Sequence, residues 1–557
     1  MDNLNQTTLF NEDILTITED SSETTSTGVE NEISILKYEA VPYQDGIDIV
    51  EAKKANAKAF KDILDEILPA GGTIKIPEGR FLLSESIAVT GANYIKIVNE
   101  GVLEADPLLN SEVGDDGPVQ KPVFQFLNCK EVYYEGGTIQ SNHESAEVIY
   151  SPKGHNRVAN VPTTMRTGIS STGCEKVEIK NATFSGLEYA ILLMTAEKLG
   201  TDLRNVDVTI GNITVTETAQ PIFVSDTHNV TIENVDMISR AKMSSGDHFI
   251  YCSRNVDNVY IGGNNKFEYS DYNYGCAINL RNADETTDSV KLCTIDNVEV
   301  TNMYRQFVSA KADTRIICNN CKVTTRETIV NSSDSIPVFF VGERASIDII
   351  NCTVEDKIHQ YMLTSLYDDV QVNISGGKFT GLNKVGKLAI ESGNEMNSIR
   401  LNVSSAEIET VDKYLTANSD TKAYFYPSFN NCNLFTSANY YFQSQTENCK
   451  IACYNCEFNH YSDSPEDNRV PVAYLNYGSG SVDLLDNIKI INCKGYGTKG
   501  VSHFGVEGKS TTYGNYFSYT ENGVTKVNST CVHEGSITLN MLSPELQAAI
   551  TPLLTTS

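Results

Sequence analysis

Short runs of alternating apolar and polar residues recur along the chain, and an asparagine separates each run from the next. The repeated phrase is an Asn, a small residue or Cys, one or two more residues and then an apolar one, as in Asn181-Ala-Thr-Phe184 and Asn351-Cys-Thr-Val354. Between those two, successive phrases start 31, 22, 30, 33, 23 and 31 residues apart. A period of two on both sides of a turn residue predicts strand, bend and strand. The phrase also starts at Asn212, Asn234, Asn264, Asn297, Asn320, Asn431 and Asn455, with glycine in its place at Gly136 and Gly376.

Repeats of this length predict a solenoid, and strand repeats predict a right-handed parallel β-helix of about 12–13 rungs, an all-β fold. Asparagine suits the bend because it tolerates left-handed backbone and its amide bonds to neighbouring backbone. Stacked rungs would place these amides in a ladder, one strand spacing of roughly 4.8 Å apart. The phrases lack the 3.6-residue apolar spacing of helical repeats and the longer, more even unit of a propeller.

A different pattern precedes the repeats, and we expect residues 41–105 to form a cap helix and the first strands. Apolar residues fall on one helical face from Ala52 to Ile67, with Phe60 and Leu64 widening it. A Gly-Gly pair and the strand Thr73–Ile76 follow. Such a helix would shield the apolar end of a β-helix from water.

The string Asp45-Gly46, a helix, Gly71-Gly72-Thr-Ile-Lys-Ile-Pro77-Glu-Gly79 and then an aromatic resembles the start of pectate-lyase-like β-helix proteins. That superfamily includes polygalacturonases, rhamnogalacturonases and phage tailspikes. With the repeats, the resemblance covers roughly residues 42–500, and residues 106–500 would form the parallel β-helix itself. It implies the fold and leaves the chemistry open.

The two ends of the chain differ from this body. Residues 1–40 are rich in Ser, Thr, Asp and Glu without periodicity, and we interpret them as an arm that orders against other virion tail proteins. In the C-terminal region, 501–557, Ser543 and Pro544 predict the start of a short helix. This tail resembles segments of phage tail fibres and spikes; an ordinary docked helix is the alternative.

Composition narrows the partners. The formal charge of -29 argues against nucleic acid and anionic membrane surfaces. The first residues have neither a basic start nor an apolar run, so we expect synthesis in the host cytoplasm without a secretory signal. The fourteen Cys would then be reduced. Because Cys321, Cys352, Cys432, Cys456 and Cys493 all follow the repeat's asparagine, we expect a buried column of thiols, with no metal and no cofactor.

One face of the predicted helix gathers groups that suit an acidic glycan. Aligning neighbouring rungs by their apolar strands, such as His248-Phe-Ile-Tyr, brings carboxylates, tyrosines and cations together, the chemistry that glycan binding or cleavage requires. The substrate-binding candidates are His248, Gln220, Tyr274, Arg254, Arg281, Arg305 and Lys311.

The segment Gly246–Cys252 allows comparison with the polygalacturonases. Their motifs, Asn-Thr-Asp, Asp-Asp, Gly-His-Gly and Arg-Ile-Lys, are matched only at Asp247, with partial likeness at Lys311, so that activity is rejected. A glycosidase needs two carboxyl groups about 5–5.5 Å or 6.5–9.5 Å apart. Asp247 with Asp226 or Glu188 are the candidates, one as general acid and the other as base or nucleophile. A lyase would instead use His248, Tyr274 or Lys311 as base.

These observations favour a phage tailspike or receptor-binding protein of the virion tail that binds host cell-surface polysaccharide, with depolymerisation left open. The resemblance implies a homotrimer. No long heptad run is visible, so the sequence pattern itself does not indicate a coiled-coil trimer. A non-catalytic adhesive or structural appendage is the alternative. A free hydrolase or lyase of the pectinase type is the second alternative.

Overall fold

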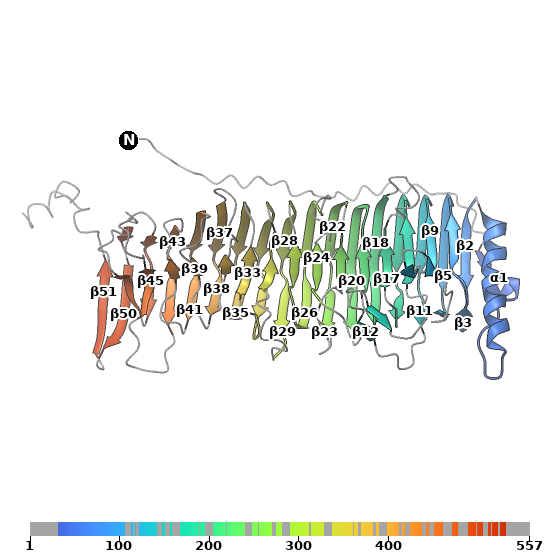
Figure 1. Cartoon of the computed structure of the whole chain (residues 1–557), viewed down its shortest axis with the longest axis horizontal. Coiled ribbons are helices and arrows are strands. Elements are labelled where there is room, and N and C mark those ends of the chain that lie inside the picture. Colours follow the sequence, from blue (N-terminus) through green and yellow to red (C-terminus); the bar gives the residue numbers. More distant parts are fainter. Residues whose placement is uncertain are drawn as a thin grey trace, which may run out of the picture.

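The computed structural model shows a long stack of parallel strands, with α1 at one end and β50 and β51 at the other (Figure 1). It describes residues 32–530 with gaps, chiefly at 106–112, 142–147, 151–155, 159–166, 195–203, 240–247, 270–274, 281–289, 328–336, 389–397, 411–414, 418–423, 437–441, 445–449, 461–469, 477–487 and 505–510. Almost every strand pairs in parallel with its equivalent in the rungs before and after, which makes the molecule a parallel β-helix.

Each rung supplies two successive strands to a first sheet and one to a second. The first sheet contains β1 (Glu32–Ser34), β2 (Gly72–Ile76), β3 (Arg80–Leu83), β5 (Tyr94–Asn99), β6 (Val102–Ala105), β10 (Glu131–Glu135), β11 (Thr138–Ser141), β15 (Lys176–Lys180), β16 (Thr183–Ser185), β18 (Asn205–Thr216), β20 (Thr227–Ser239), β22 (Val256–Gly262), β23 (Asn265–Tyr269), β25 (Leu292–Asp296), β26 (Val298–Met303), β28 (Arg315–Asn319), β29 (Lys322–Thr325), β31 (Ser346–Ile350), β32 (Thr353–Glu355), β34 (Val370–Ser375), β35 (Lys378–Leu382), β37 (Ser398–Ser404), β38 (Glu407–Thr410), β40 (Tyr424–Asn430), β41 (Asn433–Thr436), β43 (Ile451–Tyr454), β44 (Glu457–His460), β46 (Ile488–Ile491), β47 (Lys494–Tyr496), β49 (Thr511–Tyr513), β50 (Asn515–Glu521) and β51 (Val524–Thr530).

The second sheet contains β4 (Ile87–Thr90), β9 (Pro122–Leu127), β14 (Thr167–Thr172), β17 (Tyr189–Leu193), β19 (Ile222–Val224), β21 (Ile250–Cys252), β24 (Ile278–Leu280), β27 (Val308–Ala310), β30 (Pro337–Phe340), β33 (Tyr361–Ser365), β36 (Gly386–Leu388), β39 (Leu415–Ala417), β42 (Phe442–Ser444), β45 (Val470–Asn476) and β48 (Thr498–Phe504). Two short antiparallel pairs lie outside both sheets: β7 (Val113–Gly114) with β8 (Gly117–Pro118), and β12 (Val148–Tyr150) with β13 (Asn156–Val158).

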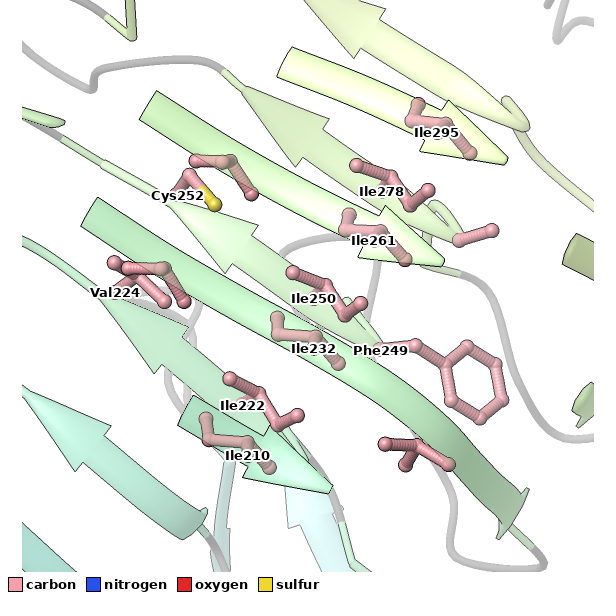
Figure 2. Close-up of a cluster of buried hydrophobic side chains, with 14 of the residues drawn as sticks. Ile210, Ile222, Val224, Ile232, Phe249, Ile250, Cys252, Ile261, Ile278 and Ile295 are labelled. Carbon is pink, nitrogen blue, oxygen red and sulfur yellow. The ribbon is translucent and has the colours of Figure 1, made fainter. Parts of the chain in front are cut away.

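The core is a set of apolar columns that run along the stack between the two sheets. Ile210, Ile232 and Ile261 occupy equivalent positions in β18, β20 and β22, and all are fully buried. Figure 2 shows these side chains packing beside Ile222 and Ile250 of the second sheet. Because side chains alternate between the two faces of a strand, every second residue of each repeat enters this core.

The predicted asparagine bend is confirmed at most of its positions. Asn181, Asn212, Asn234, Asn297, Asn320, Asn351, Asn431 and Asn455 all have φ between 51° and 58°. Asn264 is the exception, because Gly263 before it takes the left-handed position at φ 75°. Adjacent bends bond to each other, as where Asn297 Nδ2 donates to Asn264 Oδ1 at 2.8 Å.

Two details differ from the sequence prediction. The second sheet has 15 strands within the described residues, more than the predicted 12–13 rungs. Some rungs carry another residue at the bend, as Ser405 does at φ 55°, so the asparagine phrase misses them. Residues 32–34, which the sequence pattern assigns to the arm, form β1 and pair with β2.

The helix α1 (Ile49–Ile67) and the 3-10 helix η1 (Ile35–Tyr38) lie next to the first rungs. Asp48 caps α1 by accepting from the Val50 and Glu51 N–H groups. Phe60 is fully buried and packs edge-on against Phe124 of β9, with ring centroids 5.9 Å apart. The sequence therefore predicted this helix and its apolar face; its function as a cap stays a prediction.

The predicted C-terminal helix at Ser543 lies outside the described residues. The last described elements are β50 and β51, which pair antiparallel. Among the described helices, none is long and apolar enough to cross a bilayer.

Candidate functional site

The outward face of the second sheet carries a run of aromatic side chains, which we call the aromatic row: Tyr189, Phe223 and Tyr251. Phe223 lies between the fully buried Ile222 and Val224, so alternation points it outward, and Tyr251 occupies the equivalent position in the next rung. The Phe223 ring centroid lies 6.0 Å from Tyr189 and 5.1 Å from Tyr251, edge to face in both cases. All three side chains are partly exposed, so they form an apolar surface that a ligand can contact.

A second set of residues, the polar row, begins beside it and consists of Gln220, His248, Cys276 and Gln306. Ile222, Ile250, Ile278 and Val308 pair in register, and each polar-row residue lies two positions before one of them. The His248 ring also packs against Tyr251, with centroids 5.2 Å apart. The two rows therefore meet at β21.

Hydrogen bonds tie the polar row to the next rung. The Cys276 N–H donates to His248 Nδ1 at 3.0 Å, and the Asn279 carboxamide lies 2.6 Å from His248 Nε2. The Cys276 thiol donates to Gln306 Oε1 at 3.0 Å. Gln220 and His248 are each 5% exposed and Asn279 is 6% exposed, so these polar side chains are almost completely buried.

Of the predicted substrate-binding residues, the structure places Gln220 and His248 at equivalent positions in neighbouring rungs. Arg305 lies one residue before the equivalent position, Gln306, and its main-chain carbonyl accepts from His359 Nε2 at 3.1 Å. Tyr274, Arg254, Arg281 and Lys311 lie outside the described residues.

Of the predicted catalytic carboxylates, only Asp226 lies within the described residues; Asp247 and Glu188 do not. Asp226 is 3% exposed and has a left-handed φ of 47°, immediately after Ser225 at the end of β19. Its Oδ1 accepts from Asn255 Nδ2 and its Oδ2 accepts from the Ser225 hydroxyl, each at 2.8 Å. In this arrangement its carboxylate holds the bend between the two sheets.

A cationic cluster lies near this bend, at the start of the outer face of β20 and β22. Asp257 binds three basic groups: Lys291 Nζ at 2.7 Å, His228 Nδ1 at 2.6 Å and Arg204 Nη2 at 3.2 Å. Partial burial opposes ionisation of Asp257, but the hydrogen bonds from Lys291 and His228 and the charge of Arg204 lower its pKa to about 2. The cluster links four successive rungs by ion pairs and hydrogen bonds.

The thiols are structural. The twelve cysteines that the structure describes are all free and buried, and the predicted inward column at Cys321, Cys352, Cys432, Cys456 and Cys493 is confirmed. The Cys456 N–H donates to the Cys493 sulfur at 3.4 Å, so consecutive members are in contact. Burial raises the pKa of Cys252 to about 12. Within the described ranges, no three His, Cys, Asp or Glu side chains gather as metal ligands would.

The candidate site residues that the sequence analysis missed include Phe223, Tyr251 and Asn279, and the polar-row members Cys276 and Gln306. The aligned strands Gln220-Pro-Ile-Phe223 and His248-Phe-Ile-Tyr251 did contain the signal. These strands serve in the sequence analysis only to align the rungs, whereas alternation from the central isoleucine directs the last residue of each outward.

Comparison with known proteins gives similarity of fold alone. No protein-family model and no curated protein matches the chain. Among solved structures, PfbA, a surface adhesin of Streptococcus pneumoniae, is 14% identical, with a TM-score of 0.35 over 89% of this chain and 100% of that one. The tailspike gp49 of Pseudomonas phage LKA1 is 12% identical, with a TM-score of 0.40 over 87% of this chain and 84% of that one.

A third similar structure is the catalytic unit of a GH87 alpha-1,3-glucanase from Streptomyces thermodiastaticus. It is 11% identical, with a TM-score of 0.36 over 81% of this chain and 68% of that one. At identities and TM-scores this low, the likeness describes repeated coils of strand and gives no information on activity.

Proposed function

We propose that the chain binds polysaccharide on the outward face of its second sheet, across the aromatic and polar rows. The observation that carries the proposal is the meeting of partly exposed rings with amide and imidazole groups at β19, β21 and β24. A sugar ring presents an apolar C–H face and a rim of hydroxyl groups. Aromatic surface suits the first, and a few fixed polar groups suit the second.

The biological setting that we propose is the one the sequence favours. The chain is a tailspike-type appendage of a phage tail, a homotrimer that attaches by its N-terminal arm and binds host cell-surface polysaccharide. A non-catalytic adhesive appendage is the first alternative. The resemblance of residues 45–79 to pectate-lyase-like proteins supports a protein of the β-helix type. The resemblance of the chain's C-terminal segment to segments of phage tail fibres and spikes supports the virion role.

Cleavage is a further step, for which Asp247 is the first carboxylate to test. Asp226 already accepts two hydrogen bonds and is almost fully buried, so it is less available as an acid or base. Glu188 precedes Tyr189 of the aromatic row and remains a candidate partner. Chemistry would then occur at the edge of the proposed binding face.

Binding is tested with a pair of tyrosines, one in each sheet. Tyr251 belongs to the aromatic row, whereas Tyr260 is partly exposed on the outer face of β22, in the other sheet. Purified capsular polysaccharides from candidate hosts are the probes. We expect Tyr251→Ala to weaken binding about tenfold, in line with the loss of one aromatic contact, and Tyr260→Ala to leave it unchanged. Equal effects of both variants, or of neither, would overturn the proposed face.

Cleavage is followed on the same polysaccharides by chain length, reducing ends and the absorbance of the unsaturated lyase product. Products that wild type forms and Asp247→Asn does not would support a depolymerising spike. Binding without any product supports the adhesive alternative. Activity recovered from host cells with no virion-associated protein would support a free hydrolase or lyase instead.

A further inference from the structure

The hydrogen bonds of His248 define its protonation state. Its Nδ1 is 3.0 Å from the main-chain nitrogen of Cys276, which can only donate. Nδ1 must therefore carry the lone pair, and a neutral ring then carries its hydrogen on Nε2. The same bond cannot form with an imidazolium, because both ring nitrogens would then be donors.

This tautomer orients the Asn279 carboxamide. As placed, the amide nitrogen lies 2.6 Å from Nε2, so two donors face each other, while the amide oxygen is buried without a hydrogen-bond partner. A half-turn of the carboxamide brings its oxygen to Nε2 as the acceptor. The two donors then no longer face each other, and the amide oxygen has a partner. The amide nitrogen of Asn279 is then the atom left without a partner in the protein.

A second amide nitrogen is also buried without a hydrogen-bond partner. Gln220 Nε2 is buried and has no hydrogen-bond partner. Leaving a buried polar group without a partner destabilises a protein, so two such groups on one face indicate that something else accepts from them. Gln220 precedes β19 and Asn279 lies in β24, so the two donors flank the rung that carries His248 and Tyr251.

We infer that His248 is a positioning residue, whose neutral Nε2–H form holds the Asn279 amide so that Asn279 and Gln220 donate to the ligand. The inference rests on the proposed function and specifies its ligand chemistry: a sugar unit that stacks on Tyr251 and offers acceptor oxygens, of hydroxyl or ring type, on both sides. With both ring nitrogens occupied, His248 is unavailable as a general base.

Acid should therefore weaken binding through His248. Protonation breaks the bond from Cys276 and turns both ring nitrogens into donors. The contacts described above bring two titratable side chains near this ring: that of Cys276, whose main chain bonds to it from the next rung, and that of Tyr251, whose ring packs against it. Both are neutral in their acid form, so they do not change charge as the pH falls from 7 to 5.

The free protein gives the first test, independent of any glycan. Histidine labelled with ¹⁵N in the full chain is followed by NMR, and the His248 signals are assigned by their loss in His248→Gln. We expect a neutral ring at pH 7 with Nε2 protonated and Nδ1 bare. An imidazolium, or hydrogen on Nδ1, would overturn the inference.

Binding at two pH values gives the second test, with the capsular polysaccharide that wild type binds as the probe. Glutamine keeps one acceptor and one donor and does not titrate, whereas phenylalanine keeps only the ring shape. We expect wild-type affinity to fall about tenfold from pH 7 to 5, the loss of roughly one well-placed hydrogen bond. His248→Gln should bind with little pH dependence, and His248→Phe should bind weakly at both values.

His228→Gln is the matched control, because His228 lies in the cationic cluster of the other sheet. It should keep the wild-type pH profile. Equal pH dependence of wild type and His248→Gln would overturn the positioning role. If no polysaccharide binds at all, the proposed function fails, while the NMR experiment still decides the state of His248.

Discussion

Asparagine turns this chain at most rungs, and its side chain does more than tolerate the bend. Asn297 has a φ of 55°, and its Nδ2 donates both to Gly263 O at 2.7 Å and to Asn264 Oδ1 at 2.8 Å. Backbone conformation and inter-rung bonding therefore come from one residue. Glycine supplies only the first of these and alanine neither, so substitution can separate the two contributions.

We expect Asn297→Gly to lower the stability slightly and Asn297→Ala to lower it further, by about 1–2 kcal/mol more, the cost of a left-handed alanine. Thermal unfolding measures the order of stability of wild type and the two variants. All three are compared at a single scan rate, because a chain of this size can unfold irreversibly. An alanine variant at least as stable as the glycine variant would show that backbone strain does not limit the bend.

The buried thiols give a second prediction at the scale of single residues. The chain has fourteen cysteines, and the twelve described ones are buried. Burial shields these sulfurs from a thiol reagent in the folded protein, so they should resist modification even where a neighbouring thiol lowers the pKa, as Cys129 does for Cys174. We expect at most two thiols to react natively and all fourteen to react in denaturant. Rapid native reaction of more than two would contradict the buried column.

At the scale of elements, in-register strands bring like positions together and so build ladders of polar side chains. On the outer face of the first sheet, Asn229 Nδ2 donates to Asp207 at 2.7 Å, and Asn258 Nδ2 donates to Asn229 at 2.9 Å. Further along, Lys322 binds Glu299 at 2.9 Å and Lys378 binds Glu407 at 2.7 Å. Such exposed pairs contribute little stability each, but a slipped register would lose all of them together.

The cationic cluster predicts how stability depends on pH. Asp257 has its pKa lowered to about 2 in the folded protein, against about 3.9 for an ordinary Asp. Its stabilising effect is therefore complete above about pH 4 and is lost as the pH falls through 2. In urea unfolding at pH 6 and pH 3, Asp257→Asn should lose less stability on acidification than wild type.

Asp65→Asn serves as the control for that experiment, because Asp65 is exposed on α1. It should show the wild-type difference between the two pH values. If Asp257→Asn did the same, the three basic groups would not be stabilising the Asp257 carboxylate.

Strands, bends and the thiol column were predictable from sequence because each depends on local pattern. The aligned strands also placed Gln220 and His248 in neighbouring rungs correctly. The alignment was wrong by one residue at Arg305, because inter-strand segments differ in length and an apolar run does not define its own register. The pairing of Asn279 with His248 was beyond prediction, since it depends on which residue of the next rung lies within hydrogen-bond distance.

At the scale of the whole molecule, one apolar core runs from Ile33 near α1 to Cys493 near the far end. Each rung buries its apolar face only against its neighbours, so stability is shared along the stack rather than centred on one nucleus. The formal charge of -29 is spread over a long surface, which favours solubility.

Assembly is the prediction that belongs to this scale. We expect light scattering to give a mass three times the chain mass of 61.3 kDa, as the proposed homotrimer requires. The mass should hold on dilution, because large obligate interfaces dissociate weakly. A monomer would remove the trimer from the proposal and leave the binding face to be judged by the tyrosine variants.

Constant register also separates the length of the molecule from the geometry of its binding face, two properties that are coupled in most folds. Asn258 pairs with Leu292, and Leu292 pairs with Arg315, so residues 292–314 add one coil without changing the alignment of their neighbours. Rungs of different lengths keep the same cross-section, because the additional residues are accommodated between the strands. In such a chain, evolution can lengthen or shorten the molecule by whole coils, while the rungs that carry the rings and amides keep their geometry.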